Sequence, residues 1–295
     1  MTESAPEAAP VRPTSKVPVS IRLRLARAAV QVIADDAGVR MLHIKGAATD
    51  PALHPTPRYG SDVDALVDPH RIPALHSALL TQGWRLYSTF RFGSSFEHAQ
   101  TYAHDTWGYF DLHRRFPGIG LSDQQAFEQL WLDHTRRESA GIPFAAPSLD
   151  AQSVILVLNS ARGKGGLPRS WSELDDDAQA RARSLVARLH AEVAFAAAEG
   201  DLERYRDRRE YRLWKATSQG GPRVAEWWGR VIAQPNLPGR LRVVAQAPLV
   251  NTDRLARRLG HAPSRAEVVR EFFARAGVGL RETAAMITRP FRRQR

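Results

Sequence analysis

The sequence predicts an α+β fold, with helices and strands intermixed in the first half and helices alone in the second. Up to about residue 147, short segments rich in β-branched and aromatic residues alternate with amphipathic segments, which is typical of a mixed α/β unit. Beyond that point, many Ala and Arg residues favour helices. The length of 295 residues suits about two domains and allows a sizeable hydrophobic core.

Three segments follow from this pattern. Residues 1–16 are rich in Pro and Ala and lack a basic region followed by an apolar one, so we expect a disordered leader and not a signal peptide. Residues 17–147 form the mixed domain, and residues 148–295 form a helical domain with a basic C-terminal tail. The longest strongly apolar stretch, Val154 to Leu158, is far shorter than the ~20 residues of a membrane span. We therefore expect a cytoplasmic protein without a membrane partner.

The elements of the first domain follow from hydrophobic spacing and from the residues that end each run. Gly38 ends the first helix, and Asp68 with Pro69 gives an N-cap and first position for the second. The predicted elements are a helix over 19–37, strands over 40–46 and 63–67, a helix over 69–81, and strands over 84–90, 96–103 and 106–113.

The second half contains helices separated by short breaks. Ser148 is a plausible N-cap for the first of them, and Gly163 to Pro168 ends it. Asp175 to Asp177 precede or cap a helix, and we assign the tryptophans at 214, 227 and 228 to the helical core. His98 and His104 are assigned to the surface. The predicted helices cover 148–161, 172–198, 202–218, 223–233, 239–259 and 264–276.

Composition restricts the chemistry that the protein can perform. Cysteine is absent, which excludes disulfides, thiolate metal sites and thiol nucleophiles and leaves Asp, Glu and His as the strong metal ligands. The net charge is +11, and only four of the 42 basic residues are lysine. A basic chain suggests polyanionic partners such as nucleic acid or nucleotides. A GC-rich genome, which favours Arg and Ala codons, explains the same composition equally well.

A pair of acids lies at the start of the strand predicted over 63–67. Asp62 and Asp64 are two residues apart, so their side chains lie on one face of the strand, about 6.5–7 Å apart along it. Two carboxylates in this position repel each other unless cations neutralise them. Carboxylate oxygens suit Mg²⁺, and two ions held in this way can clamp the attacking and leaving oxygens of a phosphoryl-type transfer. A chance pair on a solvated strand face is the alternative for this motif alone.

Two other segments support the interpretation of Asp62 and Asp64 as metal ligands. Lys45 and Gly46 end a strand upstream, where Gly allows close backbone approach to a phosphate and Lys supplies a point charge. Downstream, Asp111 and His113 share a strand face. Asp111 is therefore a candidate third metal ligand and proton acceptor, and His113 either orients Asp111 or contacts substrate. The alternatives are an exposed Lys beside a turn, and a strand-end Asp with a packed His.

Taken together, these residues resemble the uncharacterised nucleotidyltransferase family of the polymerase-beta-type nucleotidyltransferase superfamily. The resemblance covers roughly residues 20–145, and Gly83-Trp84 also matches the family's helix end. Two positions depart from the superfamily: Lys-Gly replaces the usual Gly-Ser, and Asp111 replaces a residue that is often Glu. The motifs that carry the resemblance are Lys45-Gly46, Arg58, Ser61, Asp62-x-Asp64-x-Leu66-Val67 and Asp111-x-His113.

The resemblance implies a fold and a set of roles. The fold is a mixed sheet flanked by helices, with the acidic residues on adjacent strands. Asp62, Asp64 and Asp111 would hold Mg²⁺ or Mn²⁺, with Asp111 beside the acceptor hydroxyl. The residues implied to contact the nucleoside triphosphate (NTP) donor are Lys45, Gly46, Arg58, Ser61 and His113.

The predicted function is metal-dependent transfer of an NMP from an NTP such as ATP to a hydroxyl-type acceptor, with release of pyrophosphate. The acceptor is a small molecule, a peptide or an RNA. Two alternatives stay open. One is a phosphotransferase that uses the same site on a small molecule or a peptide natural product. The other is a non-catalytic protein that binds nucleotides or nucleic acid.

Overall fold

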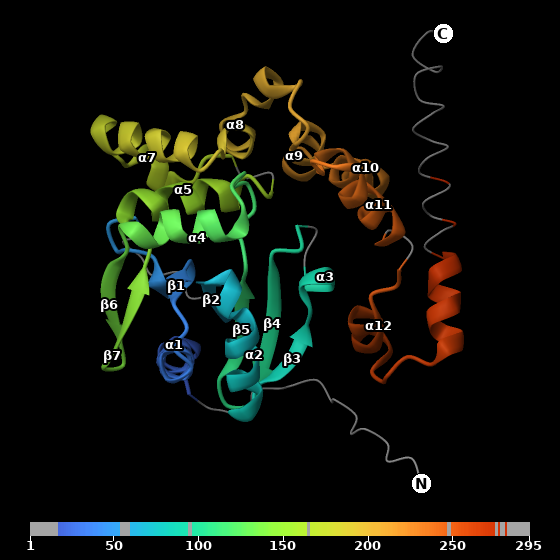
Figure 1. The fold of residues 1–295 in the computed structure, drawn as a ribbon, viewed down its shortest axis with the longest axis horizontal. Helices are drawn as coiled ribbons and strands as arrows, with labels where there is room; N and C mark the ends of the chain where they lie inside the picture. Colours follow the sequence, from blue (N-terminus) through green and yellow to red (C-terminus); the bar gives the residue numbers. More distant parts are fainter. Residues whose placement is uncertain are drawn as a thin grey trace. The chain divides into compact units, whose positions relative to one another are not determined.

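The computed structural model describes residues 17–53, 60–93, 96–163, 166–246 and 249–274, with residues 277 and 281. The predicted leader, 1–16, and the basic tail, 289–295, lie outside these residues. A seven-stranded sheet with the strand order β3-β4-β5-β2-β1-β7-β6 forms the centre of the first half (Figure 1). The strands are β1 (Met41–Ile44), β2 (Asp62–Val67), β3 (Arg85–Ser88), β4 (Ala99–His104), β5 (Gly108–His113), β6 (Thr135–Ser139) and β7 (Ile142–Ala146).

The sheet is mixed. Strand β2 lies between β1, with which it pairs antiparallel, and β5, with which it pairs parallel. Strands β3, β4 and β5 are joined by antiparallel pairing, and β7 pairs parallel with β1 and antiparallel with β6. The α+β fold class with a mixed sheet flanked by helices is therefore confirmed.

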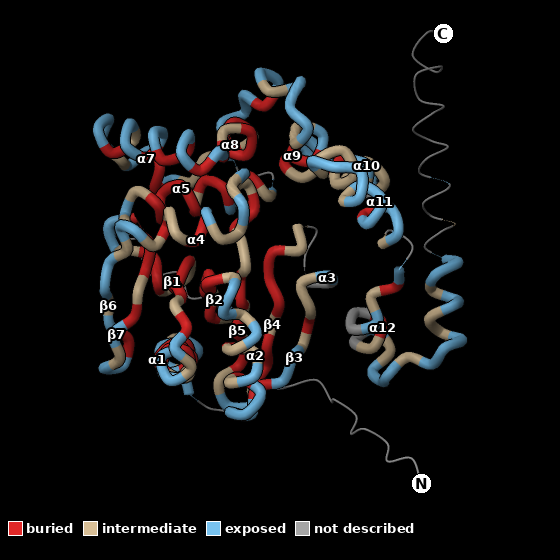
Figure 2. The backbone as a smooth tube through the Cα atoms, viewed as in Figure 1, coloured by how far each residue is buried: buried red, intermediate tan, exposed pale blue. Residues whose placement is uncertain are grey.

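One face of the sheet packs on helices α1 (Val19–Asp36) and α2 (Ile72–Thr81). The buried residues of α1 recur at the spacing expected of an amphipathic helix. A core cluster that joins helices and sheet contains Leu23, Ala26, Val30 and Ala34 of α1, Leu75 and Leu79 of α2, Val63, Ala65 and Val67 of β2, and Phe110 and Leu112 of β5. Figure 2 shows how fully the central strands β1, β2, β4 and β5 are buried.

The sequence prediction missed three elements between residues 114 and 147. Helix α4 (Asp123–Leu132) begins with a capping box in which Ser122 and Gln125 satisfy each other's backbone amides. Strands β6 and β7 form a hairpin whose turn, Ala140-Gly141, has positive φ at both residues. Charged side chains dominate β6, which suits a strand at the sheet edge but hides the apolar alternation by which strands are predicted.

The second half is helical, as predicted, but its helices are shorter. The segment predicted as one helix over 172–198 is broken at His190, which has a φ of 52°. The segment predicted over 239–259 contains two helices, one ending at Gln246 and one beginning at Thr252, and residues 249–251 between them are not helical. The helices are α5 (Leu149–Ser160), α6 (Arg169–Ser172), α7 (Asp176–Arg188), α8 (Glu192–Glu199), α9 (Tyr211–Ser218), α10 (Arg223–Ala233), α11 (Leu237–Gln246) and α12 (Thr252–Leu259), with residues 265–274 also helical.

Three smaller predictions have mixed outcomes. Asp175 caps α7 by accepting the Ala178 amide at 2.7 Å, as expected. Trp214 is buried, whereas Trp228 is 52% exposed, so its assignment to the core was wrong. The surface assignment of His98 was also wrong, because the residue is buried with its ring against that of His113.

The described residues fall into two compact units. Residues 17–160 with 167–195 form the unit that contains the sheet, and the helices from residue 196 onward belong to the other. The domain boundary near residue 147 remains a prediction. Among the helices that the structure describes, none combines the length and apolar character that crossing a bilayer requires.

Candidate active site

Two neighbouring parallel strands bring the predicted acids onto one face of the sheet. The register pairs Asp64 of β2 with Asp111 of β5 and Val63 with Phe110. Because side chains alternate along a strand, Val63 and Phe110 enter the core cluster while the acids lie on the opposite face. Asp64 and Asp111 are 47 positions apart in the sequence, but they lie close in space because the strands that carry them are hydrogen-bonded neighbours.

Asp64 is the most enclosed of the acids. Its Oδ1 atom accepts a hydrogen bond from Nε2 of His113 at 2.8 Å and lies 2.5 Å from Nζ of Lys45. The Asp64 side chain is 11% exposed, and the His113 ring is 1% exposed. The sequence suggested that His113 orients Asp111 or contacts substrate, whereas the hydrogen bond in the structure is to Asp64.

The pKa values of Asp64 and Asp111 shift in opposite directions. Burial acts to raise the pKa of Asp64, but the hydrogen bond from His113 and the charge of Lys45 outweigh it and hold the pKa at about 2. Burial raises the pKa of Asp111 to about 6, with help from the charges of Asp64 and Asp62 and against the hydrogen bond from Thr101. Asp64 is therefore fixed as a carboxylate, while Asp111 exchanges a proton near neutral pH.

Asp62 shares the face of Asp64 but stands apart from it. Its Oδ1 atom is 3.5 Å from the Ser61 hydroxyl and lies close to Gly60, so the carboxylate is turned toward the residues that precede the strand. Burial and the charge of Asp64 both raise the pKa of Asp62. Among the described residues, a group of potential metal ligands within 4.8 Å of one another contains Asp64, Asp111 and His113 but not Asp62.

Lys45 reaches Asp64 from a turn of unusual backbone conformation. Lys45 has a φ of 59° with a ψ of 178°, and Gly46 has a φ of 51°. A non-Gly residue in this region costs on the order of 1–3 kcal/mol and persists only where its surroundings hold it. The Lys45 carbonyl accepts the Ala48 amide at 3.0 Å, and the Ala48 carbonyl accepts Nη1 of Arg137 at 2.7 Å. The turn is thus fixed from within and by the edge strand β6.

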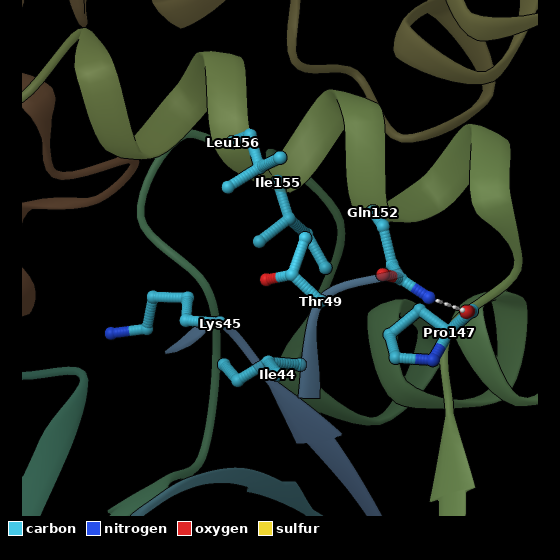
Figure 3. A pocket seen from close by; sticks show the side chains of 7 residues that line it. All are labelled: Ile44, Lys45, Thr49, Pro147, Gln152, Ile155 and Leu156. Atoms are coloured by element: carbon cyan, nitrogen blue, oxygen red, sulfur yellow. Dashed lines mark hydrogen bonds between the residues drawn. The ribbon is translucent and has the colours of Figure 1, made fainter. Parts of the chain in front are cut away.

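Helix α5 also holds the turn that follows Lys45 in place. Its Gln152 accepts the Asp50 amide and donates to the Pro147 carbonyl, both at 2.7 Å. Figure 3 shows Ile155 of α5 beside Thr49 and Gln152 hydrogen-bonded to Pro147, while the Lys45 side chain extends away from them. The cavity between these residues is about 10 Å³, which is about the least that can hold one water molecule. The side chains on this side of the turn therefore pack closely and support it.

The structure says little about two of the residues predicted to contact the NTP donor, Arg58 and Gly46. Arg58 lies outside the described residues. Gly46 begins a short 3-10 helix, Gly46–Ala48, directly beside Lys45. No substrate contact of Lys45, Gly46, Ser61 or His113 follows from the structure, and their roles toward the donor remain predictions.

Sequence reasoning missed Thr101, Arg137 and Gln152. Arg137 and Gln152 carry no local signal, because their partners are backbone groups distant in sequence. Thr101 was accessible in principle: the tight turn between β4 and β5 pairs His104 with Gly108, and this register places Thr101 opposite Asp111.

This group of potential metal ligands fits a hard divalent cation. Two carboxylates and an imidazole gathered within 4.8 Å include the oxygen ligands that Mg²⁺ and Mn²⁺ prefer. Since His113 already donates to Asp64, we assign the ligand oxygens to the acids and the orientation of Asp64 to His113. Asp62 offers a third carboxylate on the same face, outside this group.

Comparisons with known proteins are sparse. No family model matches the chain, and no curated protein matches its sequence. One solved structure that resembles it is that of the antibiotic-resistance factor ANT(2'')-Ia, at 15% sequence identity and a TM-score of 0.37, over 63% of this chain and 91% of that one. At this TM-score the similarity carries no conclusion about function, so the proposal below depends on the geometry of the site.

Proposed function

We propose that the protein is a metal-dependent nucleotidyltransferase that moves an NMP from an NTP to a hydroxyl-type acceptor and releases pyrophosphate. The observation that carries this proposal is the pairing of Asp64 with Asp111 on adjacent parallel strands, with Lys45 and His113 beside them. Acidic side chains that repel one another are costly to maintain on a half-buried sheet face, which favours a role with cations over a purely structural one.

Asp62, Asp64 and Asp111 would hold Mg²⁺ or Mn²⁺. When bound, such ions neutralise the donor phosphates and the charge that develops during transfer. Lys45 neutralises Asp64 in the structure and is 18% exposed. Its ammonium can therefore pass from the carboxylate to a phosphate oxygen of the donor.

The surroundings of the acids suggest different roles for them. Asp64 remains ionised at every physiological pH and is suited to hold a cation. Asp111 lies opposite Asp64 on the neighbouring strand, on the face that would hold the cations, and is suited to take the proton of an acceptor hydroxyl bound there. In the proposed step, the hydroxyl oxygen bonds to the α-phosphorus, the bond between the α-phosphorus and the bridging oxygen breaks, and pyrophosphate carries away the electron pair.

To test this, the protein is incubated with Mg²⁺, an NTP labelled at the α-phosphorus and a cell metabolite extract that supplies the acceptor. Transfer of the label to an acceptor is then measured. We expect label transfer with pyrophosphate release, and a loss of at least about 10³-fold in the Asp64→Asn variant, equivalent to several kcal/mol of barrier. Asp105→Asn is the matched control, because this exposed acid pairs with Arg85 on the same sheet.

Each alternative outcome has a distinct product. Release of NDP would indicate a phosphotransferase, and binding of NTP without turnover would indicate a nucleotide-binding protein. Either result would contradict the proposal, as would equal activity in the wild type and in Asp64→Asn.

A further inference from the structure

Asp111 receives its hydrogen bond from a third strand of the sheet. The Thr101 hydroxyl of β4 donates to Oδ1 of Asp111 at 2.6 Å. The antiparallel register places the two residues directly opposite each other, so both side chains lie on the face that carries the acids. Within the described part of the chain, this is the hydrogen bond that the Asp111 carboxylate accepts.

The three acids differ in how firmly they are held. Asp64 is fixed by two donors, Lys45 and His113, on one oxygen. The Ser61 hydroxyl lies 3.5 Å from Oδ1 of Asp62, a longer contact than those of the other two acids. Asp111 is held at one oxygen by a hydroxyl whose β-branched side chain has few rotamers, which leaves its second oxygen without that donor.

We propose that Thr101 is a positioning residue, which fixes the Asp111 carboxylate so that its second oxygen faces the metal ion and the acceptor hydroxyl. The inference rests on the proposed function. In this role Thr101 acts through its hydrogen bond to Asp111. A valine at this position keeps the shape of the side chain and removes the donor, whereas a serine keeps the donor.

The test compares Mn²⁺ affinity, measured by titration calorimetry, and the steady-state constants of the wild type, Thr101→Val and Thr101→Ser. We expect Thr101→Val to bind Mn²⁺ about 10–100-fold more weakly and to lose kcat more than it changes KM for NTP. Thr101→Ser should restore affinity to within a few-fold of the wild type. Thr135→Val, which removes a Thr hydroxyl from β6 of the same sheet, is the control and should leave both readouts unchanged.

The outcomes separate this inference from the proposed function. Wild-type Mn²⁺ affinity and turnover in a folded Thr101→Val variant would overturn the role of Thr101 alone. A wild-type protein that binds Mn²⁺ but transfers no nucleotide would contradict the proposed function, while the affinities still test Thr101. Failure of the wild type to bind Mn²⁺ would overturn both. A Thr101→Ser variant as weak as Thr101→Val would show that the hydroxyl is not the group that matters.

Discussion

The two faces of strands β2 and β5 have opposite chemistry. On one face, Val63, Ala65 and Val67 join Phe110 and Leu112 in the core beneath α1 and α2. On the other face, the same strands carry Asp62, Asp64, Asp111 and His113. Each residue of the first face is buried and apolar. On the second face, burial and the charge of Asp64 raise the pKa of Asp62 and Asp111, whereas the pKa of Asp64 is lowered.

Strands β2 and β5 therefore make opposing contributions to the stability of the fold. Their apolar face favours folding, and their acidic face opposes it. Burial of apolar side chains contributes about 1.5–3 kcal/mol for each large residue. Confining carboxylates next to one another subtracts from that sum unless cations neutralise them. Lys45 neutralises Asp64 in this structure, whereas burial and the charges of Asp64 and Asp62 raise the pKa of Asp111.

The largest effect is expected on the core face. Phe110→Ala should lower the free energy of unfolding of the sheet unit by about 3–5 kcal/mol, because it opens a cavity among fully buried side chains. Amide hydrogen exchange of β2 and β5 measures this change within the full chain. Phe110→Leu retains much of the volume and should cost less than half as much. Equal protection in Phe110→Ala and the wild type would contradict the assignment of this face to the core.

The acidic face should respond in the opposite direction. Asp111→Asn should stabilise the metal-free protein at about pH 7 by on the order of 2–3 kcal/mol, because it removes a carboxylate whose pKa burial raises to about 6. The folded state holds this proton more tightly than the unfolded chain, so wild-type stability falls as the pH rises from about 4 to about 6. The advantage of the variant should therefore be small at about pH 4 and full above about pH 6.

Unfolding midpoints at both pH values, without divalent cations, test this prediction. A variant less stable than the wild type at about pH 7 would show that the acids are not in conflict. Asp64 should behave differently: its pKa is lowered to about 2, so its contribution is present above its ordinary pKa and is lost as the pH falls toward about 2.

The smallest effect is expected away from both faces. Ser122→Ala removes the N-cap of α4 and should cost about 1 kcal/mol of stability, because an amide at the helix start loses its acceptor. Mn²⁺ affinity should be unchanged, which makes this variant a reference for stability loss without damage to the site. A drop in Mn²⁺ affinity would mean that general destabilisation reaches the acids, and would weaken the distinction between the two faces.

Much of the site could be predicted because its residues lie in short, regular strands. Alternation along 62–64 and 111–113 is enough to place each pair on one face, and Gly46 marks the end of the preceding strand. The partner of His113 could not be predicted, since it depends on the register between β2 and β5, and parallel pairing has no local turn to fix it. Strand β6 escaped prediction because its charged residues give no apolar period.

By itself, the sequence determined which groups are available for chemistry: no thiols, the acids Asp62, Asp64 and Asp111 in predicted strand segments, Lys45 beside Gly46, and a helical second half. The tertiary structure alone decided that Asp64 and Asp111 are opposite each other, that Lys45 and His113 converge on Asp64, and that Thr101 holds Asp111. The physical reason is that local periodicity fixes which face a side chain occupies. Which neighbours share that face depends on strand order and register, which the whole core sets.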